Sequence, residues 1–200
     1  MKSFFDLQKF RNSLLYNWKE IFLFFSILFV FYINSSYMGY PDEFVNILGG
    51  KFILAGKLPY KEFFDHHMPL GWYIASFLLL FSFKSFVLFR VWWAFFTYIL
   101  LFIGALWIRK NSKEIYTYYL GFFVLYPLIS VYYWLHLYLA DSLATVFFSL
   151  VFWILLVQTI QKKAYFRVLI VSSFLTFFLV FSSLTFSYLA LALYVWHIYL

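Results

Sequence analysis

Long apolar runs constrain this chain more than any other feature. They approach the length of about 20 residues that a helix needs to cross the hydrocarbon core of a membrane. A segment in lipid must satisfy its own backbone hydrogen bonds, which favours helices. The sequence therefore predicts an all-α fold, a polytopic transmembrane helix bundle of about six spans. The runs cover residues 21–33, 86–108, 115–134, 142–160, 168–183 and 184–200.

Composition supports a membrane class and argues against other classes. The chain is 66% hydrophobic and 28% aromatic, with only 12% charged residues, so it would aggregate as a soluble domain. The formal net charge is +7, but the basic residues form short clusters between apolar runs. This pattern indicates topology signals and no nucleic-acid partner. With no cysteine in the chain, any metal must bind histidine or a carboxylate.

The N-terminal segment predicts the orientation of the first helix. Residues 1–20 carry Lys2, Lys9, Arg11 and Lys19 and precede the first apolar run. They resemble a signal peptide, but no clear small-residue cleavage site follows, which favours a retained signal anchor. We therefore expect a cytoplasmic N-terminal segment at 1–20 and a transmembrane module at 21–200.

The apolar stretch Met68–Phe83 is shorter than a typical span. If it crossed the membrane, the basic clusters at 109–113 and 162–167 would both lie outside, against the positive-inside rule. If it lies in the interface, both clusters return to the cytoplasmic side. We therefore predict one external loop over 34–85.

The external loop itself has helical features. Phe44, Leu48, Phe52 and Ala55 follow a helical spacing, with Glu43, Asn46 and Gly50 on another face. Gly56 and Pro59 are typical of a helix end, and Pro69 suits the first turn of a second helix. The loop is thus predicted to hold two interfacial helices on the outer membrane surface.

Acids and histidines gather on the outer side in this topology. No charged residue falls near the middle of a predicted span, where an ion-coupled transporter would need one. The predicted external loop carries Asp42, Glu43, Glu62, Asp65, His66 and His67. Asp141 and the basic residue Arg90 lie near the outer ends of later helices.

An ordered set of motifs runs over about Met38–Val151: Asp42-Glu43, Gly56-Lys57 with Tyr60, His66-His67-Met68-Pro69-Leu70, Trp72-Tyr73, Arg90 and Asp141. This set resembles the GT-C membrane glycosyltransferases, particularly the protein O-mannosyltransferase and aminoarabinose transferase group. Met68 replaces a proline of the family pattern, and the C-terminal part of the family fold is expected to be absent.

The resemblance implies inverting transfer of a sugar from a polyprenyl-phosphate donor to a lipid, protein or glycan acceptor at the external face of a bacterial inner membrane. It implies catalytic roles for Asp42 and Glu43, with Asp42 as general base. Contacts to substrate would come from Lys57, Lys61, Asp65 and Arg90. A divalent metal ion would be bound by His66, His67 and Asp141.

Other interpretations of the same residues stay open. Asp42 and Glu43 could cap an interfacial helix, the histidines could be interfacial anchors, Asp141 could cap the helix that follows it, and Arg90 could extend to the head groups. At the level of the whole chain, the alternatives are a catalytically incomplete fragment of such an enzyme and a polytopic carrier of lipid-linked substrates.

Overall fold

The computed structural model describes residues 18–65, 68–83, 85–161 and 166–199, with side chains from residue 21 onward. Within these ranges the chain forms eight α-helices and no β-strand, which confirms the all-α prediction for them. The helices are α2 (Trp18–Asn34), α3 (Pro41–Leu54), α4 (Leu70–Phe81), α5 (Phe86–Asn111), α6 (Lys113–Ser130), α7 (Ala140–Gln161), α8 (Phe166–Ser182) and α9 (Phe186–Tyr199).

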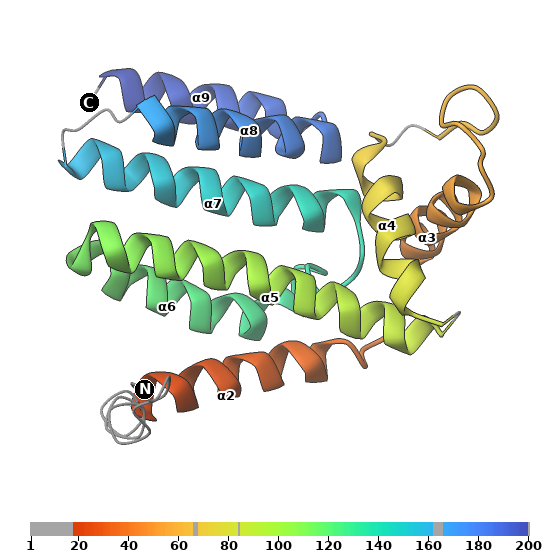
Figure 1. The fold of residues 1–200 in the computed structure, drawn as a ribbon, viewed down its shortest axis with the longest axis horizontal. Coiled ribbons are helices and arrows are strands. Elements are labelled where there is room, and N and C mark those ends of the chain that lie inside the picture. Colours follow the sequence, from red (N-terminus) through yellow and green to blue (C-terminus); the bar gives the residue numbers. More distant parts are fainter. Residues whose placement is uncertain (1–17, 66–67, 84, 162–165, 200) are drawn as a thin grey trace, which may run out of the picture.

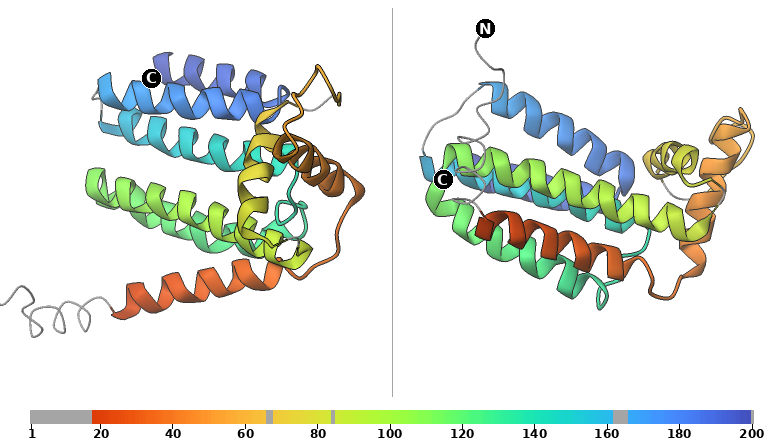
Figure 2. Two further views of the ribbon diagram at one scale, coloured as in Figure 1. Left: turned by 45° about the vertical axis from the view of Figure 1, so that its right-hand side comes forward. Right: turned by 60° about the horizontal axis from the view of Figure 1, so that its bottom comes forward.

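The helices form a bundle with a cover at one end. Helices α2, α5, α6, α7, α8 and α9 run along a common direction and alternate in polarity, whereas α3 and α4 lie across the ends of the others (Figure 1). The further views in Figure 2 show the same separation between the bundle and the crossing pair. Helices α3 and α4 are the segment predicted to form two short helices in a single loop.

The two ends of the bundle differ in charge. The start of α2, the α5–α6 turn and the start of α8 lie at one end (Figure 1), which carries Arg109, Lys110 and Arg167. The opposite end holds α3 and the start of α7, with Asp42 and Asp141. Arg109, Lys110 and Arg167 therefore lie the length of the bundle away from Asp42 and Asp141, although the α3 end also carries basic residues such as Lys51 and Arg90.

Among the described residues, two helices are long and apolar enough to cross a membrane: α5 with 26 residues and α7 with 22. Helices α2, α4, α8 and α9 are apolar but shorter. The core is formed mainly by large side chains at the helix contacts, including Trp72, Trp93, Tyr119, Tyr126 and Tyr138, each at most 2% exposed.

The predicted helix over 115–134 ends earlier than expected. Helix α6 stops at Ser130, and an irregular segment follows over 131–139, where Trp134 has a φ of 59°. The side-chain amide of Asn34, the last residue of α2, donates to the Pro127 carbonyl at 2.5 Å and to Ser130 Oγ at 2.8 Å. This side chain fixes the end of α6 against the end of α2.

Helix α3 buries the face that was predicted to be its polar one. Glu43, Asn46 and Gly50 are buried, while Phe44 and Leu48 are about half exposed. The reason is close packing on α4, because a Cβ atom at Gly50 would lie 2.7 Å from Ala75 Cβ and 2.8 Å from the Ser76 backbone nitrogen. Phe44, Val45 and Leu48 are left on the outer face, as an interfacial helix requires, whereas Ile47 is buried.

The end of α3 follows the sequence prediction. Gly56 has a φ of +80°, a conformation that glycine adopts without strain. Its N–H donates to the Ile53 carbonyl at 2.9 Å, and the N–H of Lys57 donates to the Phe52 carbonyl at 3.0 Å. These are the two hydrogen bonds of a Schellman motif.

Candidate functional site

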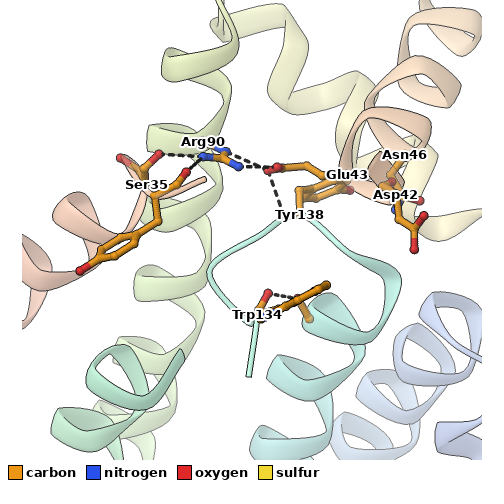
Figure 3. Close-up of polar contacts among 9 residues, drawn as sticks. Ser35, Asp42, Glu43, Asn46, Arg90, Trp134 and Tyr138 are labelled. Carbon is orange, nitrogen blue, oxygen red and sulfur yellow. Dashed lines mark hydrogen bonds and ion pairs between the residues drawn. The ribbon is translucent and has the colours of Figure 1, made fainter. Parts of the chain in front are cut away.

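A buried ion pair joins Glu43 of α3 to Arg90 of α5 (Figure 3). Arg90 Nη2 lies 2.6 Å from Glu43 Oε2, and Arg90 Nε donates to Glu43 Oε1 at 3.0 Å. The backbone N–H of Tyr138 also donates to Glu43 Oε1, at 3.3 Å. The side chains of Glu43 and Arg90 are 0% and 5% exposed. The Glu43 carboxylate is therefore buried and bound by Arg90 and the Tyr138 N–H.

Arg90 also holds the segment that connects α2 to α3. Its Nη1 donates to the Tyr37 carbonyl and lies 3.5 Å from the Ser35 carbonyl. The guanidinium group rests 4.6 Å above the ring of Phe86. The backbone passes so close that a Cβ atom at Gly39 would lie 3.0 Å from Arg90 Nη2. Arg90 thus joins α5 to the α2–α3 connection and to α3.

Asp42, next to Glu43 in the sequence, points away from the ion pair (Figure 3). It is exposed in the first turn of α3, where the helix dipole favours its negative charge. Together with Asp141 of α7 it lines a cavity of about 320 Å³. The remaining walls come from α3, from the residue Met68 before α4, from the start of α7 and the residue before it, and from the end of α8 with the α8–α9 turn: Asn46, Met68, Leu139, Ala140, Ser182, Ser183, Leu184 and Thr185. The structure therefore brings the predicted residues Asp42 and Asp141 to one site.

Asp141 is exposed in the first turn of α7 and is held from across the cavity. Ser183 Oγ donates to Asp141 Oδ1 at 2.8 Å and lies 2.7 Å from Thr185 Oγ1. These two hydroxyls come from the α8–α9 turn, which sequence reasoning treated only as a boundary between helices. The signal that could have found them is a group of serine and threonine residues between two apolar runs.

Asn46 lies one helical turn after Asp42 and is 1% exposed. Its Nδ2 donates to the Asp42 carbonyl at 3.0 Å. Its Oδ1 is buried and has no hydrogen-bond partner among the residues that the structure describes. Because an unsatisfied buried acceptor costs free energy, this side of the cavity favours a donor or a cation near Asn46.

The other residues predicted to contact substrate lie outside this cavity. Lys57 is exposed, with its Nζ 4.6 Å above the ring of Phe52, and Lys61 is also exposed. Asp65 is partly buried, and its charge adds to the effect of burial in raising the pKa of Tyr60. None of these three residues is among the described residues that line the cavity.

His66 and His67 fall outside the described residues. Met68, which follows them directly, lines the cavity. Over the described part of the chain, no group of three or more histidine, aspartate or glutamate side chains is placed to hold a metal ion. The described carboxylates at the cavity are those of Asp42 and Asp141.

Another cavity, of about 290 Å³, is lined by the α2–α3 connection and by the irregular segment 131–139. Tyr40 and Trp134 meet there with ring centroids 4.4 Å apart. His136 also lines it, and burial lowers the pKa of this histidine from its ordinary value. Sequence reasoning did not select His136.

Comparison with protein-family models, with curated proteins and with solved structures found no match for this chain.

Proposed function

We propose that the chain is an integral protein of a bacterial inner membrane, with α2 and α5 to α9 crossing the bilayer and the N-terminus in the cytoplasm. Two features support this arrangement. The basic residues of the α5–α6 turn and of the start of α8 share one end of the bundle, as the positive-inside rule requires of clusters on the cytoplasmic side. Helices α3 and α4 lie across the opposite end (Figure 1), where interfacial helices with exposed apolar residues would be stable.

In this membrane the chain acts as a glycosyltransferase that moves a sugar from a polyprenyl-phosphate donor to a lipid, protein or glycan acceptor at the outer face. One observation carries the proposal: Asp42 and Asp141, far apart in the sequence, line a single cavity at the acidic end of the bundle. A lipid-linked donor presents its sugar and phosphate at this depth, and the cavity volume of about 320 Å³ leaves room for a monosaccharide.

Asp42 is the general base of the proposed reaction. Its carboxylate is exposed in the cavity and takes the proton from the acceptor nucleophile. The acceptor then forms a bond to the anomeric carbon, with inversion, as the bond from that carbon to the phosphate oxygen breaks. The electron pair of the broken bond stays on the polyprenyl phosphate, whose added charge needs a cation or donors nearby.

Glu43 and Arg90 act on this site through the backbone. Because Glu43 is bound by Arg90 and by the Tyr138 N–H, we assign it a positioning role that sets the first turn of α3 and so the direction of Asp42. Arg90 serves the same role and does not bind substrate itself. A separate proposal is that the substrate extends beyond the cavity and contacts Lys57, Lys61 and Asp65.

The donor set at the cavity fits a hard divalent cation. The Asp141 carboxylate and the orphaned Asn46 Oδ1 are oxygen ligands, which such ions prefer, and His66 and His67 directly precede a wall residue of the cavity. A bound divalent ion would supply charge neutralisation to the leaving phosphate.

The test is sugar transfer from labelled polyprenyl-phosphate sugars in membranes that contain the chain. Asp42→Asn keeps the size and most hydrogen bonds of the side chain but removes the base, so transfer should fall by a factor of about 100 or more. Glu62→Gln is the matched control, since Glu62 is an exposed acid of the same loop that accepts from the Leu58 N–H at 2.6 Å. Transfer by Asp42→Asn at more than about a tenth of the control rate would exclude the role.

A further inference from the structure

An apolar groove runs along the bundle at the end opposite to the candidate site. It has a volume of about 270 Å³. Its floor is α7, with Leu150 and Ile154, and its walls are α5 and α8. Helix α7 lies between α5 and α8 (Figure 1) and packs against both. This groove belongs to neither of the cavities at the acidic end.

One charged side chain, Arg167, stands among the described residues that line the groove. It is exposed and follows Phe166, the first residue of α8. From there the groove extends along α8 to Leu175, eight residues further, which corresponds to about 12 Å along a helix. One leaflet contributes about 15 Å of hydrocarbon. The groove therefore has the length of most of one acyl chain.

The charge at the mouth of the groove selects the head group. A guanidinium group binds phosphate oxygens with two parallel hydrogen bonds. A zwitterionic head group carries a cationic amine that offsets this attraction, whereas a head group with a net negative charge does not.

We propose that this groove binds an anionic phospholipid of the leaflet at the basic end, with one acyl chain against α7 and the phosphate at Arg167. The proposal rests on the proposed membrane placement of the chain but not on sugar transfer. Trp107, which lines the groove on α5, would then lie against the bound acyl chain.

The test uses the full chain in phosphatidylcholine vesicles that contain about 10% of a brominated lipid, because bromine quenches tryptophan fluorescence on contact. The probe is either brominated phosphatidylglycerol or brominated phosphatidylcholine, and Trp107→Phe identifies the part of the signal that comes from Trp107. Each cationic contact favours anionic lipid by about 1 kcal/mol, so phosphatidylglycerol should occupy the groove about fivefold more tightly than phosphatidylcholine.

Three variants separate charge from shape. Arg167→Gln should remove the preference for phosphatidylglycerol, while Lys110→Gln, the same change at an exposed residue that does not line the groove, should keep it. Val171→Phe fills the groove without a change of charge and should reduce Trp107 quenching by both lipids.

Three results would overturn the proposal: equal quenching by the two lipids in the unaltered chain, equal loss in Arg167→Gln and Lys110→Gln, or no effect of Val171→Phe. Flotation of the chain with the vesicles is measured in the same samples. A chain that does not float with them overturns the membrane placement itself, which distinguishes that failure from the absence of a lipid preference.

Discussion

Glu43 and Arg90 stand 47 positions apart in the sequence and form a two-bond ion pair that is closed to solvent. The pair connects α3, which carries Asp42, to α5, one of the two helices in the described part of the chain that are long and apolar enough to cross a membrane. Three backbone groups, those of Ser35, Tyr37 and Tyr138, complete its contacts. The pair thus attaches α3, which packs on α4, to helix α5 of the bundle.

Removal of one member of this pair should destabilise the protein strongly. Glu43→Gln leaves the guanidinium group of Arg90 buried without its counter-charge, which typically costs about 3–5 kcal/mol. Denaturant titration of the purified chain measures the free energy of unfolding. The double variant Glu43→Gln with Arg90→Met removes the orphaned charge and should recover part of the loss. If the double variant loses the sum of the two single losses, the two side chains are not coupled.

Close packing between α3 and α4 predicts opposite effects at two glycines. A Cβ atom at Gly50 would lie 2.7 Å from Ala75 Cβ and 2.9 Å from the Ala75 backbone carbon, so Gly50→Ala should separate the helices and lower stability. Gly121 of α6 has open space around it, and Gly121→Ala should be neutral or stabilising by up to about 1 kcal/mol. Thermal unfolding of both variants is the measurement. Equal effects of the two substitutions would contradict the packing of α3 on α4.

Local pattern was enough to predict much of the fold. The helix after Asp42 and its end at Gly56 follow from residues that are close together in the chain. The shared end of the two basic clusters follows from their charge. The structure has each of these features in its described residues.

What local pattern missed depends on partners distant in the sequence. The segment 131–139 is as apolar and aromatic as a helix, and only the contact of Asn34 with the end of α6 indicates where that helix stops. The burial of Glu43 requires Arg90, and the role of Ser183 requires Asp141. Spacing within a single segment cannot predict contacts of this kind.

Stability should fall in mild acid because of His136. Burial lowers the pKa of this side chain below its ordinary value of 6.5, and the nearby charge of Arg90 acts in the same direction. The unfolded chain therefore binds a proton more readily than the folded one, so stability is highest above about pH 6.5 and declines as the pH falls below it. Melting temperatures between about pH 8 and pH 5 measure this decline. His136→Gln should show a smaller decline, and identical slopes in the two proteins would exclude the histidine as its source.

The proposed topology can be tested by single-cysteine labelling, since the chain contains no cysteine of its own. A cysteine in place of Lys57 or Phe83, both exposed, should react with an impermeant thiol reagent added outside the cell. A cysteine in place of Lys110 should react only after the membrane is opened. External labelling of the cysteine at position 110, without labelling at positions 57 and 83, would mean that the bundle is inserted in the opposite orientation, with the Asp42 and Asp141 cavity on the cytoplasmic side.

The central claim, that the Asp42 cavity opens to the outer face and receives a lipid-linked phosphate, is tested most directly by protection of a cysteine at position 42. In Asp42→Cys the impermeant reagent should label the chain from outside, and added polyprenyl phosphate should slow this labelling. This probe is the product common to all such donors, so no choice of sugar is needed. Labelling of the Phe83→Cys control should not change. Labelling at position 42 only in opened membranes, or at the same rate with and without polyprenyl phosphate, would contradict the claim.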